Sequence, residues 1–204
     1  MGDFGYSKRG HDVNEAQAEV HAAFKEVRDR NDTSDPHTRR WLDAIATFRA
    51  AYARVYPDAL REVDDGERRA SELNTADMLD FLEADPIFFR SGYMKQKLLT
   101  ELKRRKLDHH EVRRLQTIIV SVVQKNDHRR EFLHYCRAAA NADDEQFRGE
   151  LMVLEQSDEP HVSQRANWAL AALDNRWLDL KHAARGHERR AGMYYRAKEP
   201  RISR

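Results

Sequence analysis

The chain is poor in the residues that interrupt or cross-link a protein. Its 204 residues include one cysteine, five prolines and eight glycines. The single cysteine, Cys136, excludes an internal disulfide framework, and a cytoplasmic location is the default expectation for such a chain. Few prolines and glycines, together with 35% charged residues, predict a soluble and helix-rich protein.

Long apolar runs are also missing. No stretch approaches the roughly 20 apolar residues that a transmembrane helix needs. The first residues, MGDFGYSKRGHD, lack the apolar core of a signal peptide. We therefore expect no membrane partner. The length is enough for one domain or for two tightly packed lobes.

Motifs for catalysis and for cofactor binding are absent as well. The ten histidines are scattered without an HExxH motif or paired Cys/His spacing, and neither a phosphate-binding glycine loop nor a nucleophile elbow occurs. His109, His110 and Glu111 are adjacent, so their side chains point in different directions and one metal ion could not easily take all three. The apolar neighbours of Cys136 indicate an inert buried thiol. We predict no catalytic, metal or cofactor site, and a non-enzymatic role is favoured while enzymatic activity stays open.

What the chain does have is apolar periodicity, which is densest between residues 85 and 140. This stretch predicts three consecutive helices, because apolar residues recur at spacings of three and four. The first should start near Ser91, the second at Asp108, and the third at Asn126 or Asp127. Short joints between them favour antiparallel neighbours.

The remaining segments also read as helices, apart from the two ends. A helix is expected from Val13 to Arg28, and another from Pro36 with Asp35 as its N-cap. Further helices should start at Pro57, at Thr75, at Asp143 or Asp144, and after Pro160. The predicted organisation is a disordered N-terminus at 1–11, an acidic helical lobe at 12–84, a basic repeat-like lobe at 85–186 and a basic tail at 187–204.

Aromatic residues in these helices have two interpretations. Trp41, Phe48 and Tyr52 lie on one helical stripe, which indicates core packing, although the same stripe could line the pocket of a small-molecule sensor. Trp168 and Trp177 are interpreted as packing anchors rather than binding platforms.

The net charge of +1 conceals an asymmetry between the two halves. From Pro86 onward there are 24 Lys and Arg against 16 Asp and Glu, a net charge of +8, whereas the preceding part is net −7. The halves could attract one another, or the basic half could bind an anionic partner. A solvated basic face is the favoured interpretation, because +8 is modest for a dedicated nucleic-acid domain.

Basic side chains gather at the predicted helix ends and form the candidate site. An antiparallel arrangement would bring Arg104, Arg105, Arg113 and Arg114 to one surface, which could bind phosphates. The alternative, which we favour, is ion pairing with Glu101, Asp108, Glu111 and the acidic half. The candidate anion-binding or nucleic-acid-binding residues are Arg90, Lys103, Arg104, Arg105, Lys106, Arg113, Arg114, Arg129 and Arg130.

Two places share a pattern in which an Asp near a helix start precedes Val-Arg and apolar residues at helical spacing. The first consists of Asp108, Glu111, Val112, Arg113, Leu115, Ile118 and Ile119. The second consists of Asp158, Pro160, Val162, Ala166, Ala169 and Leu170, with Ser163 in place of the usual Arg. This pattern resembles HEAT-like helical repeats, although Val112 and Val162 are 50 residues apart and such repeats span about 40 to 47 residues. The resemblance covers under half of the chain and implies an α-α superhelix that binds macromolecules along a concave surface.

The predicted fold class is therefore all-α, a multi-helix antiparallel array that is either a HEAT-like α-α superhelix or a compact helical bundle. The leading functional hypothesis is a non-enzymatic interaction or scaffold protein with a protein partner. The alternative is a nucleic-acid-binding protein that uses the basic C-terminal half. Because some HEAT-like proteins are DNA glycosylases, the resemblance extends this alternative to that activity, but no catalytic carboxylate can be mapped from it.

Overall fold

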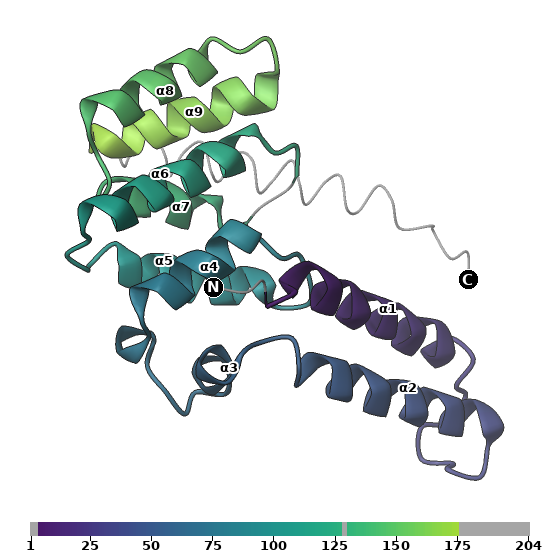
Figure 1. Ribbon diagram of the computed structural model, residues 1–204. Helices are drawn as coiled ribbons and strands as arrows, with labels where there is room; N and C mark the ends of the chain where they lie inside the picture. The colour runs from purple at the N-terminus through teal and green to yellow at the C-terminus, as the bar shows by residue number, and fades with distance from the viewer. Residues whose placement is uncertain (1–3, 128–129, 176–204) are drawn as a thin grey trace. The chain divides into compact units, whose positions relative to one another are not determined.

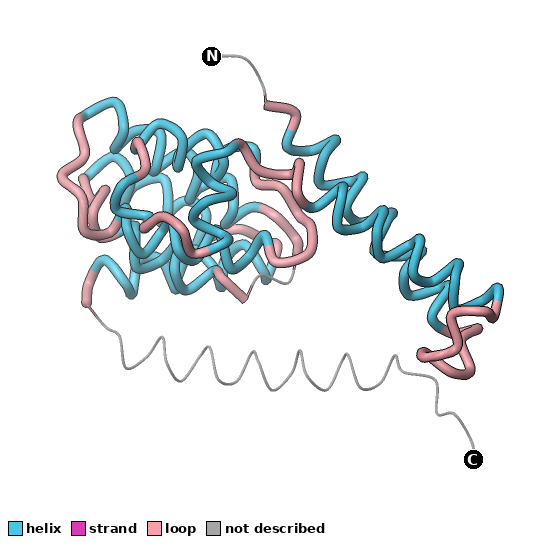
Figure 2. The backbone as a smooth tube through the Cα atoms, turned by 90° about the horizontal axis from the view of Figure 1, so that it is seen from below, coloured by secondary structure: helices cyan, strands magenta, loops and turns pink. Residues whose placement is uncertain are grey.

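The computed structural model describes residues 4–127 and 130–175 (Figure 1). In these ranges all regular structure is helical and no strand occurs (Figure 2), so the predicted all-α array is confirmed. Its α-helices are α1 Tyr6–Phe24, α2 Pro36–Tyr52, α3 Asp58–Asp65, α4 Thr75–Ala84, α5 Ser91–Leu102, α6 His109–Gln124, α7 Phe132–Ala139, α8 Glu145–Glu155 and α9 Pro160–Leu173. A short 3-10 helix covers Ala70–Glu72. Arg129, Trp177 and the predicted basic tail at 187–204 lie outside the described residues.

Side-chain caps explain where several helices begin. The Asp35 carboxylate accepts a hydrogen bond from the N–H of His37 at the start of α2, and Pro36 occupies the first helical position. Asp108 and Glu111 form a full capping box at the start of α6. Asp144 caps α8 through the N–H of Phe147. These starts were predicted from the sequence and are confirmed.

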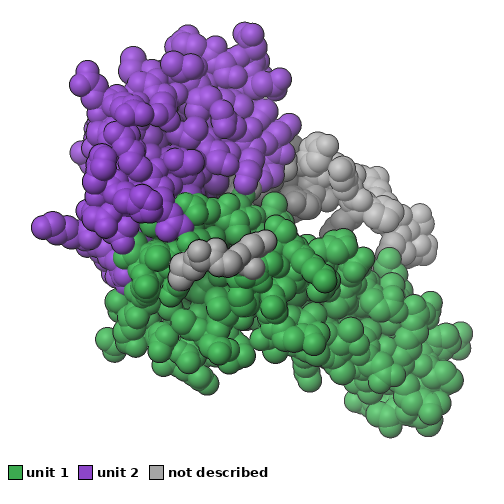
Figure 3. Space-filling view, viewed as in Figure 1, with its two compact units in different colours: residues 1–95 green, residues 96–204 purple. Residues whose placement is uncertain are grey.

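Contacts divide the chain into two units, residues 1–95 and residues 96–204 (Figure 3). Helix α5 contributes residues to both units. The acidic and basic lobes that the sequence predicts, with a boundary after Ala84, stay a prediction. Each unit has its own helical packing and is described by itself.

In the N-terminal unit, α1 and α2 lie side by side as an antiparallel pair (Figures 1 and 2). Helix α1 begins at Tyr6 and ends at Phe24, so the expected range from Val13 to Arg28 was wrong at both ends. Residues 6–11, expected to be disordered, belong to this helix. Tyr6, Gly10 and Val13 are buried on one face of it, and the ring of Tyr6 packs edge-on against Phe81 with 5.2 Å between ring centroids.

The aromatic residues of α2 pack on their own neighbours. Phe48 lies 6.0 Å from Tyr52 and 5.6 Å from Phe89, measured between ring centroids. The Tyr52 hydroxyl donates a hydrogen bond of 2.6 Å to Asp64 on α3. Trp41 packs against Phe24 of α1. These contacts support a packing role for the stripe over the small-molecule sensor, and all three side chains are partly buried rather than fully enclosed in a core.

A buried ion pair joins the end of α4 to α5 within this unit. Asp85 follows α4 in a left-handed conformation with φ of 45°, outside the right-handed helical region that the proline after it disfavours. Its carboxylate accepts a hydrogen bond of 2.6 Å from the ammonium of Lys95, and both side chains are almost completely buried, 4% and 1% exposed. Because the two buried charges pair directly, neither incurs the large desolvation cost of a buried charge without a partner.

In the C-terminal unit, α6 to α9 pack as two helical hairpins. Helix α8 runs beside α9, and α9 also contacts α7 and α6 (Figure 1). The apolar stripe of α6 is buried as predicted, which places the β-branched run of residues 117–123 in a helix rather than in a strand. Trp168 is buried against Phe132, as the packing interpretation expects.

Polar side chains hold the joints of these hairpins. Arg165 on α9 is 8% exposed and donates to the carbonyl of Val122 at 2.9 Å and to those of Lys125 and Asp127. Its guanidinium also lies over the ring of Phe132. One side chain thus satisfies carbonyls at the end of α6 and in the connection that follows.

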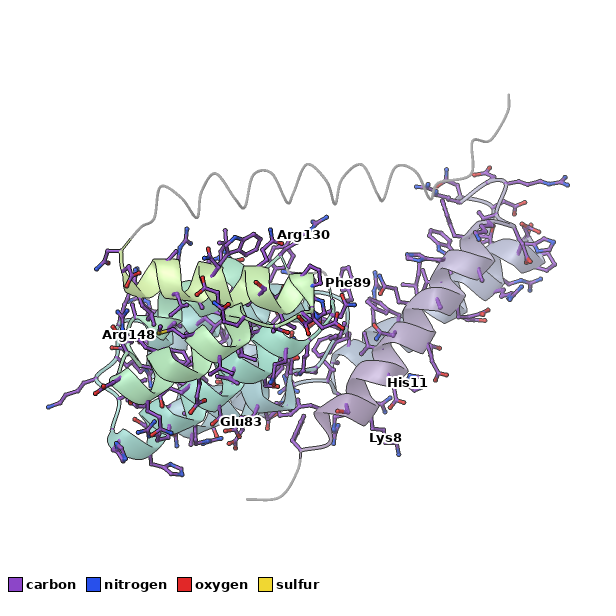
Figure 4. All side chains as sticks on the ribbon, turned by 90° about the horizontal axis from the view of Figure 1, so that it is seen from above. Lys8, His11, Glu83, Phe89, Arg130 and Arg148 are labelled. Atoms are coloured by element: carbon purple, nitrogen blue, oxygen red, sulfur yellow. The ribbon has the colours of Figure 1, made fainter. Side chains whose placement is uncertain are left out.

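A second arginine ties the start of α8 to the end of α9. Arg148, labelled in Figure 4, pairs with Asp143 at 2.7 Å and with Asp174 at 2.8 Å. The hydrogen bonds to these two carboxylates raise the pKa of Arg148 above its ordinary value. These ion pairs therefore hold α8 and α9 together at the end of the hairpin that lies opposite the connecting turn.

A candidate anion site between α5 and α7

A small pocket in the C-terminal unit brings together cations from two helices. Its cavity volume is about 200 Å³, and it is lined by Leu99, Thr100, Lys103, Arg104, His134 and Arg137. Among these described lining residues three are cations, one is a histidine and none is a carboxylate. The pocket is therefore electropositive.

Larger hollows occur in the N-terminal unit but differ in chemistry. One of about 870 Å³ surrounds the connection between α1 and α2, and it mixes Lys25, Arg28 and His37 with four carboxylates from residues 26–35. Another of about 460 Å³ lies beside the start of α1, and Lys8, Arg9 and Arg54 line it together with Asp12. Arg9 already donates to the carbonyls of Phe4 and Arg54 there. The smaller pocket is the stronger candidate for an anion site, because it combines three cations with no carboxylate among its described lining residues.

Helical spacing explains how α5 presents its part of the pocket. Lys103 and Arg104 follow the helix in turns that continue it, with the N–H of Lys103 bonded to the carbonyl of Leu99 at 3.1 Å. Thr100 therefore lies one turn before both cations on the same face. Leu99 is 1% exposed and anchors this segment in the core.

The end of α5 is capped by another residue. The Asn141 amide donates hydrogen bonds to the carbonyls of Leu102 at 2.8 Å and Arg105 at 2.7 Å. Asn141 thus satisfies two of the carbonyl groups that a helix end leaves without an intrahelical partner.

Helix α7 contributes His134 and Arg137, which are one turn apart. The Nδ1 atom of His134 lies 3.4 Å from the Thr100 hydroxyl oxygen, and that hydroxyl donates to the carbonyl of Gln96 at 2.7 Å. The hydroxyl oxygen can therefore only accept from the imidazole, which favours a hydrogen on Nδ1 and leaves Nε2 as the atom that takes up a proton. Burial, with a smaller effect of Arg137, holds the pKa of His134 below its ordinary value.

The structure places the predicted basic residues in different settings. Arg105 pairs with Glu101 at 3.2 Å, and both side chains are 18% exposed. Arg113 donates to Gln116 at 2.9 Å and lies 3.5 Å from Asp144. Arg105 therefore pairs with one of the expected carboxylates, whereas Gln116 and Asp144, the partners of Arg113, were not among those expected.

Of the other predicted residues, only Lys103 and Arg104 line the pocket. Lys106 and Arg130 are exposed, Arg114 is partly buried, and Arg90 belongs to the N-terminal unit. The surface expected to be shared by Arg104, Arg105, Arg113 and Arg114 stays a prediction.

Three pocket residues were missed as site residues from the sequence: Thr100, His134 and Arg137. The spacing of 134 and 137, and of 100, 103 and 104, places each set on one helical face, and this signal is present in the sequence. Which face of α5 meets which face of α7 depends on tertiary packing. Helical periodicity alone does not supply that information.

Other candidate chemistry in the described residues has a structural explanation. Cys136 is completely buried, and burial raises the pKa of its thiol to about 12, as expected for an inert thiol. Across residues 4–127 and 130–175, no three His, Cys, Asp or Glu side chains cluster as metal ligands would. None of the helices in those ranges combines the length and apolar character required to cross a membrane.

Comparison with protein-family models, with curated proteins and with solved structures finds no match to this chain.

Proposed function

We propose that this chain is a non-enzymatic interaction protein that binds a protein partner through its C-terminal unit. The observation that carries the proposal is the cation-lined pocket between α5 and α7, where Lys103, Arg104 and Arg137 meet without a lining carboxylate among the described residues. An acidic side chain of a partner that enters this pocket would exchange water for charge-assisted hydrogen bonds.

The packing around the pocket supports binding without rearrangement. Asn141 fixes the segment that follows α5, and the buried face of α7 includes Tyr135 and Cys136. The backbone that carries the cations is already ordered, so binding does not have to fold it, and the entropy cost is confined to the side chains, at about 0.5–1.5 kcal/mol for each one immobilised.

Capture of partners by the immobilised full chain tests this proposal. We expect proteins that are retained by the wild-type chain to be lost, by about tenfold or more, from the double variant Arg104→Glu and Arg137→Gln. Arg39→Glu repeats the Arg104→Glu charge reversal at an exposed position of α2, so it is the control for that change and should retain them. Equal retention by the double variant and the wild type would contradict the proposal.

Nucleic-acid binding is the second candidate, and the net charge of +8 from Pro86 onward favours it. Binding to labelled single-stranded and double-stranded DNA and RNA should then weaken steeply with salt, because each neutralised phosphate releases counterions. A DNA glycosylase is the narrower form of this candidate and would also release a base. The absence of salt-sensitive binding would eliminate both forms.

A further inference from the structure

We propose that the pocket between α5 and α7 receives a single phosphate monoester group, carried by a phosphorylated side chain of the protein partner. The source of the phosphate rests on the proposed function. The affinity of the pocket for the phosphate group itself does not.

The size of the pocket fits one phosphate group. Its volume of about 200 Å³ is below the roughly 300 to 1,000 Å³ typical of sites for drug-sized ligands. That space accommodates a tetrahedral anion and the atoms that attach it, whereas a nucleotide with its base and sugar is larger.

The charges in the pocket match a dianion. A phosphate monoester carries a charge of about −1.5 to −2 at neutral pH and offers three strong acceptor oxygens. Lys103 and Arg104 approach from the end of α5, and Arg137 approaches from α7. The two guanidinium groups can each bind two phosphate oxygens, and the ammonium adds a point charge.

The neighbouring cations argue for one phosphate rather than for a chain of phosphates. A nucleic-acid backbone requires a track of basic side chains along its length. Next to the pocket, Arg105 is paired with Glu101, and Arg113 is engaged with Gln116 and Asp144. Arg105 and Arg113 therefore already have partners and do not extend the pocket into such a track.

His134 makes the site sensitive to pH. Its ring lies beside Thr100 and faces Lys103 and Arg104 from α5 and Arg137 from its own helix. Its pKa is held down by burial and by Arg137 in the free protein, and a bound anion would raise it. By linkage the affinity for an anion must rise as pH falls through this range, because the anion-bound form binds the proton more tightly.

Titration of the full-length chain with small anions tests the site directly. The probes are sulfate, inorganic phosphate and O-phosphoserine, observed through the NMR signals of the His134 imidazole, with sodium chloride at matched ionic strength as the control. We expect saturable shifts with all three probes and none with chloride. Sulfate has a constant charge between pH 5 and 8, so its affinity isolates the titration of His134 and should be higher at pH 5.

Variants assign the binding to named side chains. Arg104→Glu and Arg137→Gln should each weaken binding by about tenfold, since each removes one charge-assisted contact. Lys106→Glu, an exposed cation that does not line the pocket, should change it less than threefold. A His134→Gln variant, followed by backbone amide signals of α7, should bind sulfate with the same affinity at pH 5 and pH 8. Shifts that do not saturate, or affinities unchanged in both arginine variants, would overturn the site.

The source of the phosphate is decided by competition. A phosphoserine peptide should displace sulfate, while its unphosphorylated form should not. A single-stranded oligonucleotide without terminal phosphates that displaces sulfate better than O-phosphoserine, at equal phosphate concentration, would overturn the inference in favour of nucleic acid.

Partner capture separates this inference from the proposed function. Capture that depends on the pocket but survives phosphatase treatment would overturn only the phosphate chemistry. Saturable phosphate binding without such a partner would overturn only the proposed function and, with it, the source.

Discussion

Buried polar side chains determine how firmly the joints between these helices are held. Arg165, Asn141 and Gln116 each bond two or more groups from other segments, and Gln116 donates to the Ala142 carbonyl at 2.7 Å and to Asp144 at 2.9 Å. The N–H of Phe147 and the amide of Gln116 lower the pKa of Asp144. Each bond replaces one to water, so the net gain per bond is about 1 kcal/mol, whereas a buried group left without its partner costs about 1–3 kcal/mol.

At the same scale, the ion pair between Asp85 and Lys95 has the clearest energetic consequence. We expect Lys95→Met to lower the free energy of unfolding by about 3–5 kcal/mol, because the buried Asp85 carboxylate would lose its charged partner. Chemical denaturation of the full chain measures this loss.

The double variant Lys95→Met and Asp85→Asn is the matched control for that prediction. It removes both charges, and asparagine tolerates the left-handed backbone at position 85. It should therefore recover most of the lost stability. A double variant no more stable than Lys95→Met alone would show that the pair is not what the single variant disrupts.

Two of the site residues could be recognised from composition and spacing, and the others could not. Lys103 and Arg104 stand out in the sequence as part of a basic run at a helix end. His134 and Arg137 become site residues only because α7 packs with that face toward the end of α5. Long-range packing of this kind leaves no local pattern, so the sequence predicted the cations of α5 without the helix that completes the pocket.

At the scale of elements, most helix starts can be predicted from local capping residues, but the start of α1 could not. Its first turns bury Tyr6 and Gly10, and a Cβ atom added at Gly10 would lie 3.1 Å from the ring of Phe88. A buried glycine marks a close contact between segments, but it does not contribute to the apolar pattern from which a helix is predicted. The segment therefore looked disordered although it is packed. The starts of α2, α6 and α8, in contrast, are marked in the sequence by their capping residues Asp35, Asp108 and Asp144.

The connection between α6 and α7 is the element that one side chain most clearly controls. We expect Arg165→Met to lower the free energy of unfolding by about 3 kcal/mol, and to accelerate amide hydrogen exchange most in the last turn of α6, because the carbonyls of Val122 and Lys125 lose their donor.

Arg165→Lys keeps the charge and tests the geometry of that contact. An ammonium cannot reproduce the planar fork that reaches several carbonyls at once, so this variant should also be destabilised, though less than the methionine variant. Exchange in α6 that matches the wild type in both variants would contradict the role assigned to Arg165.

At the scale of the whole molecule, the chain consists of two helical units that divide after Lys95. The all-α class was predictable from composition and periodicity. The HEAT-like superhelix stays a prediction: the pattern at Asp108 coincides with a real capping box, whereas at the second place the N-cap of α9 is Glu159. Similar stripes arise in any stacked helical hairpins, so this pattern does not separate a superhelix from a bundle.

The central claim is that the partner engages the C-terminal unit at the end of α5 and at α7. Hydrogen exchange of the full chain, measured by mass spectrometry with and without the captured partner, tests it most directly. The account predicts slower exchange in peptides covering residues 99–106 and 132–139, with little change in α1 and α2. Protection confined to α1 and α2, with exchange at 99–106 and 132–139 unaltered, would contradict it.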